Sequence, residues 1–273
     1  MTAFISSGKC RRVPGGFTLV EIAVAIFIIA ILLGSILVPL TTQVEQRQVS
    51  ETQKMLEDIK EALIGHAIAK GYLPCPDATS GGGANDGVED FDAATGRCIL
   101  GTTSGTICPA FPASLLGTNC RAVGNVPWAS LGLGASDPWG NRFRYVVDMK
   151  FSARSPQVGT PFGFASAADL CVGPTAAACA TPLPTRLTAP SPDGAVAVII
   201  SHGKNGRSAI NASTGATNTA ATSADELDNV GGPGYTSRPI TAVGSTAGEF
   251  DDVVTWLNKY TLFNRMVAAG KLP

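Results

Sequence analysis

Apolar residues are unevenly distributed along the chain, and their longest run lies close to the N-terminus. From residue 17 to residue 40, only Glu21, two hydroxyl side chains, one glycine and Pro39 interrupt the apolar sequence. Because a helix rises about 1.5 Å per residue, a helix of this length crosses a hydrocarbon core of roughly 30 Å. The pattern therefore predicts a transmembrane helix over residues 17–40.

The pattern changes between residues 41 and 71, where we predict an amphipathic continuation of the same helix. Apolar side chains recur here mainly every three or four positions, with charged residues on the opposite face. Gly71 follows as a helix stop, and Pro74 comes soon after. The apolar stripe needs a cover, either a sheet of the same chain or a second helix in a coiled coil of about two heptads. The stripe consists of Val44, Met55, Leu56, Ile59, Leu63, Ile64, Ala67 and Ile68.

The remaining residues, 72–273, predict an exported globular head domain made of short strands, turns and loops. Residues 72–130 are rich in glycine, proline and cysteine, which is typical of an irregular region tied by disulfides. Together with the helix, the head predicts an α+β fold, in which a long N-terminal helix packs on a small antiparallel sheet. The other expected elements are strands over 142–149, 195–201 and 251–256, a flexible loop over 208–224 and a short amphipathic helix over 262–269.

Charge is nearly balanced over the whole chain, with 20 lysine and arginine residues against 21 aspartate and glutamate residues. Three of the basic residues, Lys9, Arg11 and Arg12, lie in the first 16 residues, which contain no acid. Removing these three from the 20 leaves 17 basic residues against 21 acidic ones, a net charge of −4. We therefore expect no general binding of nucleic acid. The basic segment is expected to stay in the cytoplasm, which places the chain after residue 40 outside.

The chain has seven cysteines, of which Cys10 lies in the basic N-terminal segment and six follow the apolar run. An even set in an exported, glycine- and proline-rich region predicts three disulfides. A cysteine-ligated metal is the alternative, but no CxxC pair occurs, and neither His66 nor His202 has a cysteine within four residues. Sequential pairing closes the shortest loops, so we predict the pairs Cys75–Cys98, Cys108–Cys120 and Cys171–Cys179.

The junction between the basic segment and the apolar run has an unusual order. Residues 9–21 read KCRRVPGGFTLVE, so small residues precede the apolar segment, whereas an ordinary secretory signal places them after it. An ionisable side chain such as Glu21 is costly in a membrane helix and usually has a partner. Cleavage after Gly16 would create that partner, an amino group on Phe17. The alternative is an uncleaved anchor in which Glu21 reaches the membrane surface.

The sequence Gly-Phe-Thr-Leu-Val-Glu after a short basic leader resembles the class III signal of type IV prepilins and type II secretion pseudopilins. The resemblance implies that prepilin peptidase removes residues 1–16, cutting after Gly16, and methylates the new terminus, Phe17. It implies that Glu21 neutralises a terminal amine during filament assembly and that the helix bends near Pro39. It also implies a single-pass bacterial inner-membrane protein with a cytoplasmic N-terminus and a periplasmic or exported head.

The turn Asp-Pro-Trp-Gly-Asn at residues 137–141 is similar to one that precedes a strand in major pseudopilins, which also carry a calcium-binding Ser-x-Gly-x-Asp-Gly loop. Residues 201–206 keep the spacing of that loop, but Asn205 replaces its aspartate and Lys204 adds a cation. This lost charge weighs against calcium, and the large head with its extra cysteines favours a minor or specialised subunit. The candidate calcium ligands that the resemblance implies are Asn205, Asp225, Glu226, Asp228, Asp251 and Asp252.

No arrangement typical of catalysis is evident in the sequence. Ser201 and His202 are neighbours in sequence, which is a poor placement for Ser-His-Asp chemistry, and no GxSxG motif occurs. We expect no enzymatic activity, and no cofactor other than a structural calcium ion.

We therefore expect a structural subunit, a pseudopilin or minor pilin, of a type II secretion pseudopilus or a type IV pilus. The partners that the resemblance implies are prepilin peptidase, other pilin or pseudopilin subunits, membrane lipid and an inner-membrane assembly platform with a separate ATPase. The alternative is a membrane-anchored exported binding or adhesion protein that does not polymerise.

Overall fold

The structure is a computed structural model. In it the chain forms two compact units, residues 1–47 and 48–273. The described residues are 16–78, 84–93, 96–99, 121–152, 162–175, 177–179, 186–231 and 234–272, without the side chains of 34–42. Most of the basic leader, including Cys10, therefore lies outside the described residues, as do Cys108 and Cys120.

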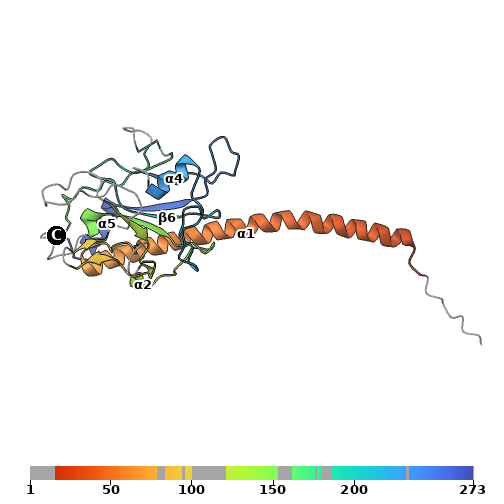
Figure 1. Cartoon of the computed structure of the whole chain (residues 1–273), viewed down its shortest axis with the longest axis horizontal. Coiled ribbons are helices and arrows are strands. Elements are labelled where there is room, and N and C mark those ends of the chain that lie inside the picture. Colours follow the sequence, from red (N-terminus) through yellow and green to blue (C-terminus); the bar gives the residue numbers. More distant parts are fainter. Residues whose placement is uncertain are drawn as a thin grey trace, which may run out of the picture. The chain divides into compact units, whose positions relative to one another are not determined.

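Helix α1 runs from Leu19 to Lys70 and contributes residues to both units (Figure 1). In the first unit, the large apolar side chains described between Phe17 and Leu33 are all at least half exposed. Among the described residues, no helix is both long enough and apolar enough to cross a membrane. The transmembrane helix over residues 17–40 thus remains a prediction.

In the second unit, the remainder of α1 buries most of the predicted apolar stripe, from Leu56 onward, whereas Val44, in the first unit, is 51% exposed. Leu63 and Ala67 are fully buried, and they belong to one apolar cluster with strand residues such as Tyr145 and Ile199. Burying a leucine or isoleucine in this way contributes about 1.5–3 kcal/mol. The helix ends before Gly71, whose φ of 87° is a left-handed conformation that favours glycine. The stripe is therefore covered by a sheet of the same chain.

That sheet is four-stranded and antiparallel, in the order β3-β4-β6-β8. All seven residues of β6 are buried, because one face packs in the cluster with α1 and the other in a second apolar cluster that includes Tyr235. The three predicted strands are confirmed, with bounds that differ by up to two residues at β4 and β8. The strands are β3 (Arg121–Asn125), β4 (Arg144–Asp148), β6 (Ala195–Ser201) and β8 (Val253–Asn258).

The sequence did not predict β3, which lies in the region expected to be irregular. It also did not predict α4, which begins at Ala224, the last residue of the expected loop; no element was expected over residues 225–231. The predicted C-terminal helix is confirmed as α5, which begins three residues earlier than expected. The smaller elements are β1 (Phe91–Asp92), β2 (Arg97–Cys98), α2 (Trp128–Leu131), α3 (Met149–Ser152), β5 (Val172–Gly173), α4 (Ala224–Gly231), β7 (Tyr235–Thr236) and α5 (Lys259–Ala268). Strands β5 and β7 pair in parallel, so the sheet content is not wholly antiparallel.

Two of the three predicted disulfides are confirmed. Cys75 bonds to Cys98 and Cys171 to Cys179, with Cα atoms 5.1 and 5.9 Å apart. The third predicted pair lies outside the described residues. The two confirmed bonds close loops within the head, as the short spacings predicted.

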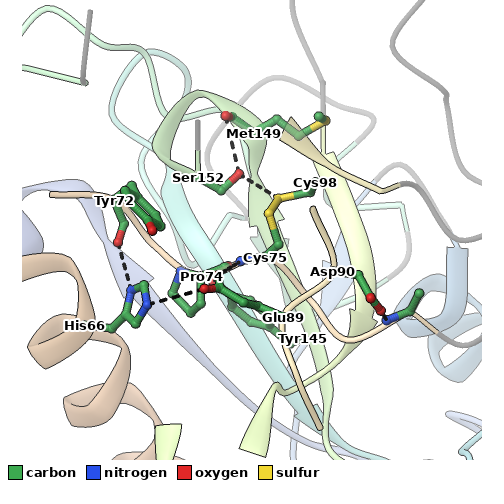
Figure 2. Close-up of a disulfide and its surroundings, with 11 residues drawn as sticks. His66, Tyr72, Pro74, Cys75, Glu89, Asp90, Cys98, Tyr145, Met149 and Ser152 are labelled. Carbon is green, nitrogen blue, oxygen red and sulfur yellow. Dashed lines mark hydrogen bonds and ion pairs between the residues drawn. A yellow bond between two sulfur atoms is a disulfide. The ribbon is translucent and has the colours of Figure 1, made fainter. Parts of the chain in front are cut away.

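The first of these disulfides fixes the chain where it leaves α1 (Figure 2). The Tyr145 hydroxyl, on β4, donates a hydrogen bond to the Pro74 carbonyl at 3.1 Å. The Glu89 carboxylate accepts the backbone N–H of Cys75 at 3.3 Å. His66 is half-buried, with its Nδ1 3.1 Å from the Tyr72 carbonyl oxygen. These contacts join the end of the helix to the sheet and to the disulfide loop.

Candidate functional site

The N-terminus of α1 is held by a reciprocal pair of hydrogen bonds between Thr18 and Glu21. Thr18 directly precedes the first helical residue, Leu19, and is the N-cap. The Glu21 Oε2 atom accepts the backbone N–H of Thr18 at 2.8 Å and its hydroxyl at 2.9 Å. The Glu21 N–H in turn donates to the Thr18 hydroxyl at 3.3 Å. This arrangement is a capping box, which satisfies backbone donors that the first helical turn leaves unpaired.

The capping box keeps the Glu21 carboxylate at the start of the helix. An anion is favoured there, because the aligned peptide dipoles place partial positive charge at a helix N-terminus. Phe17, the residue expected to become the new N-terminus, immediately precedes the capping threonine. The Glu21 carboxylate therefore lies in the first turn of α1, five residues after Gly16, where cleavage is predicted. The sequence signature of this capping box is Thr-x-x-Glu at residues 18–21, which the hydrophobic pattern alone does not reveal.

Packing does not explain the glycine at position 16. A Cβ atom added to Gly16 would meet nothing within 4 Å. The described residues therefore leave room for a larger side chain at this position. Pro39 lies within α1, among the residues whose side chains are not described, so the predicted bend stays a prediction.

A second group of functional candidates lies in the head, where the chain leaves β6 and enters β8. Glu226 on α4 and the adjacent Asp251 and Asp252 each offer one carboxylate oxygen, and these atoms all lie within 4.8 Å of one another. Glu226 is 1% exposed and Asp252 is 4% exposed. Three acids are thus gathered in a mostly buried place, which we call the acidic cluster.

Some oxygens of the acidic cluster have partners and two do not. Asn205 donates its backbone N–H to Asp251 Oδ2 at 2.6 Å and its side-chain amide to Glu226 Oε1 at 3.0 Å. Asp252 accepts the Asn229 amide at 2.7 Å, and its other oxygen lies 3.3 Å from His202 Nδ1. Glu226 Oε2 and Asp251 Oδ1 are buried without a hydrogen-bond partner.

Burial and mutual repulsion disfavour the ionised forms of these acids. Burial, with further repulsion from Asp252, Glu226 and Glu249, raises the pKa of Asp251 to about 6. Burial also raises the pKa of Glu226 above its ordinary value, against the lowering effect of the Asn205 amide. The cluster therefore favours a proton or a bound cation. Its carboxylate oxygens are the type of ligand that calcium takes.

The structure separates the six candidate calcium ligands into different roles. Asp225 pairs with Arg238 at 2.6 Å, and Asp228 accepts the Thr236 hydroxyl at 3.2 Å. The Asn205 side-chain oxygen accepts the N–H of Arg207 at 2.9 Å, which turns its amide group toward the acidic cluster. Only three of the six, Glu226, Asp251 and Asp252, form the described acidic cluster.

The turn at residues 137–141 is anchored by its first residue. Asp137 Oδ1 accepts the backbone N–H groups of Trp139 and Asn141 at 3.0 and 2.9 Å. Its Oδ2 accepts the hydroxyl of Ser201 at 2.7 Å, which ties the turn to the last residue of β6. His202, the next residue, is 1% exposed and contacts Asp252. The neighbours Ser201 and His202 therefore have separate carboxylate partners.

One comparison with known proteins identifies the N-terminal segment. Residues 11–37 match the family described as "Prokaryotic N-terminal methylation motif", and this span contains Gly16, Phe17, Thr18 and Glu21. No curated protein and no solved structure matches the chain. The motif implies processing by prepilin peptidase and assembly with other pilin subunits. The chain thus carries the prepilin signal of type IV pilins and pseudopilins, which indicates a protein of the type IV pilin-like or pseudopilin class.

Proposed function

We propose that the chain is a structural subunit, a pseudopilin or minor pilin, of a type II secretion pseudopilus or a type IV pilus. The observation that carries the proposal is the methylation motif at residues 11–37. The capping box supports it, because it holds the Glu21 carboxylate at the start of a long helix with an exposed apolar surface. Such a helix requires either lipid or other helices around it.

The proposed role of Glu21 is electrostatic. An acidic side chain near the centre of a membrane helix costs about 2.5–3.5 kcal/mol on insertion scales, and less near the interface. Hydrogen bonds from Thr18 offset part of this penalty while the leader is attached. Cleavage after Gly16 then creates a cationic amine on Phe17. Pairing between such an amine and Glu21, in the same or a neighbouring subunit, neutralises both charges and allows the apolar helices to pack together.

The proposed location is the bacterial inner membrane, with the leader in the cytoplasm and the head exported. The two confirmed disulfides support export, because disulfides persist in oxidising compartments such as the periplasm. Residues 17–40 form the proposed membrane anchor before assembly. The chain would depend on a separate ATPase and membrane platform to enter a filament.

Two sequence features support a choice within this class. The turn at residues 137–141 favours a subunit of the secretion type, because it is similar to the turn of major pseudopilins. The large head and its additional cysteines favour a minor or specialised subunit over the bulk subunit. A membrane-anchored binding protein that does not polymerise is the alternative function.

Processing is tested by expressing the full chain in two bacterial strains, one with prepilin peptidase and one without. We expect mass spectrometry to find a chain that begins at a singly methylated Phe17 in the first strain and an intact leader in the second. A leader that remains attached in the presence of an active peptidase would refute the proposal. Cross-linking of the processed chain to pilin subunits in the membrane separates the filament subunit from the non-polymerising alternative.

A further inference from the structure

We propose that Lys150 and Asp169 are joined by an intramolecular amide bond between Lys150 Nζ and Asp169 Cγ, formed with the loss of one water molecule. This covalent modification site lies in the head, at the end of strand β4. It does not depend on the proposed filament role, because all the residues involved belong to the second unit.

The two side chains meet in a buried place beside a second carboxylate. Lys150 Nζ is in direct contact with Asp169 Oδ2 and lies 3.5 Å from Asp148 Oδ2. The side chain of Asp148 is 1% exposed, that of Asp169 is 4% exposed and that of Lys150 is 10% exposed. One cation and two anions are therefore gathered where little water reaches. Because charges are costly to bury, the site favours a reaction that removes two of them.

The backbone holds both reacting groups in place. Lys150 lies in α3, which follows β4 without a break. The two neighbours of Asp169 form backbone bridges with residues 193 and 195, so this segment is fixed beside the start of β6. Lys150 Nζ thus contacts an oxygen that is bonded directly to the Cγ atom that it would attack. Groups held in such positions react far faster than the same groups free in solution.

Asp148 is placed to carry protons between the two groups. Its Oδ1 accepts the backbone N–H of Lys150 and its Oδ2 accepts that of Asp169, both at 3.1 Å. These hydrogen bonds hold the Asp148 carboxylate beside both reacting side chains. Burial raises the pKa of Asp148 to about 6, so this carboxyl can gain and lose a proton near neutral pH.

Ser191 contacts the other oxygen of Asp169. Its hydroxyl donates a hydrogen bond to Asp169 Oδ1 at 2.5 Å. Negative charge would collect on this oxygen when the nitrogen attacks Cγ, and a donor already in place stabilises that charge, as in an oxyanion hole. The remaining oxygen, Oδ2, is then the one that leaves.

The reaction balances without another reactant. Asp148 takes a proton from the Lys150 ammonium and passes it to Asp169 Oδ2, which gives a neutral amine and a neutral carboxylic acid. The C–N bond forms when Nζ attacks Cγ. The bond from Cγ to Oδ2 breaks when Asp148 passes a second proton from the nitrogen to the leaving hydroxyl. One water molecule is released, and Asp148 ends in the ionised form in which it began.

A second buried lysine provides a comparison. Lys259 Nζ lies 3.1 Å from Asp193 Oδ1, but the Asp193 side chain is 36% exposed. The other described partners of this pair are the Pro192 carbonyl and the Tyr260 hydroxyl. We expect Lys259 and Asp193 to remain an ion pair, because their described contacts include no second carboxylate that could carry the protons.

The amide bond would strengthen the end of β4. It would join two residues that lie 19 positions apart in the sequence. Ser152, which is also in α3, has its Oγ 3.2 Å from the Sγ atom of Cys98 in the first disulfide (Figure 2). The same short helix would then contact one covalent link that reductants break and carry another that they do not.

The test is mass spectrometry of the full chain, purified in detergent, reduced and denatured. We expect a mass that is lower, by one water molecule, than the mass calculated for the same chain. Trypsin should release residues 145–154 joined to residues 155–186, because an acylated Lys150 is no longer a cleavage site. The joined peptides are the decisive readout, since dehydration of an Asp-Gly sequence, such as residues 86–87 or 193–194, gives the same mass.

Three variants assign the roles. Lys150→Arg keeps a cation but removes the amine, so it should have the full calculated mass. Asp148→Asn keeps both reacting groups but lacks the proton carrier. Because general acid–base catalysis contributes about 10²–10⁴-fold, we expect this variant to form the amide about a hundredfold more slowly or less. Lys259→Arg is the matched control, and it should still yield the joined peptides.

Wild-type protein that has the full calculated mass and releases residues 145–150 as a separate peptide would refute the bond, whether or not the variants fold. A normal yield of joined peptides from Asp148→Asn would refute its role as proton carrier. Neither result bears on processing of the leader or on cross-linking to pilins, so failure of this proposal and failure of the filament role can be told apart.

Discussion

The Glu21 carboxylate accepts hydrogen bonds from both the backbone N–H and the hydroxyl of Thr18. The acid of the prepilin signal therefore has partners within its own chain before any terminal amine exists. This relationship separates two roles of Glu21, helix capping and charge pairing, that a single substitution to alanine would remove together. Variants that remove only one of them give the first two predictions.

The charge of Glu21 is tested by comparing Glu21→Ala with Glu21→Gln. Glutamine can keep the capping box but carries no charge. If pairing with a terminal amine drives assembly, both variants should be processed normally and both should enter filaments poorly, as measured by cross-linking and by recovery of sheared filaments. Normal assembly of Glu21→Gln would show that the charge is dispensable.

The hydroxyl of Thr18 is tested by comparing Thr18→Val with Thr18→Ser. Loss of an N-cap side chain costs about 0.5–2 kcal/mol of helix stability. Valine should therefore accelerate amide exchange in the first turn of α1, whereas serine should keep it close to wild type. Equal exchange in the two variants would mean that the hydroxyl does not hold the helix start.

The head should depend on pH through Asp148 on β4. Burial raises the pKa of this carboxyl from 3.8 to about 6, against the opposing effect of Lys150. A carboxyl with a higher pKa in the folded state binds more protons when folded, so the free energy of unfolding falls as pH rises between these two values and is level above them. A tenfold difference in proton affinity between the folded and unfolded states corresponds to about 1.4 kcal/mol.

Asp148→Asn removes this contribution, and the variant should show a flatter stability profile between pH 4 and pH 6, within the range set by the two pKa values. Urea unfolding of both proteins across that range provides the measurement. Asp77, Asp228 and Asp251 also have a pKa raised to about 6, so the informative quantity is the difference between the two profiles. If the free energy of unfolding changed with pH to the same extent in the wild type and in Asp148→Asn, the prediction would be wrong.

The two confirmed disulfides should contribute unequally to stability. Cys75–Cys98 spans 23 residues and Cys171–Cys179 spans 8. In the chain-entropy model a longer closed loop stabilises more, and these spans predict about 1 kcal/mol more for the first bond. Paired replacement of each bond by serine, followed by urea unfolding, measures the two effects. A larger loss for the second pair would show that strain or packing dominates over loop closure.

The sequence predicted those elements whose pattern is uninterrupted. Strand β6 is a run of seven buried residues, and α1 ends at Lys70, directly before Gly71 and two residues after Ile68, the last residue of its apolar stripe. Strand β3 was missed because its five residues, RAVGN, show no clear alternation and lie in a glycine-rich region. Its strand conformation is fixed by pairing with β4, a tertiary contact that local sequence does not encode.

The acidic cluster likewise depends on tertiary contacts that could not be predicted from the sequence. The resemblance to pseudopilins named six candidate ligands, but only the fold distinguishes Glu226 from its neighbour Asp225, whose carboxylate pairs with Arg238. Helix α4, which carries both, had a detectable signal. Ser223 accepts the N–H of Glu226 at 3.2 Å, the N-cap pattern of a serine followed three residues later by glutamate.

The disulfide between Cys75 and Cys98 has a mechanical consequence for a chain held by its N-terminal helix. Tension transmitted along α1 would reach the head through the buried stripe that packs on the sheet and, along the backbone, through residues 71–75. At Cys75 the disulfide to Cys98 transmits force directly to β2. The hydrogen bond between the Pro74 carbonyl and the Tyr145 hydroxyl transmits force to β4. The loop between the two cysteines would then bear little load, so changes in its length or composition should leave the resistance of the head to pulling intact.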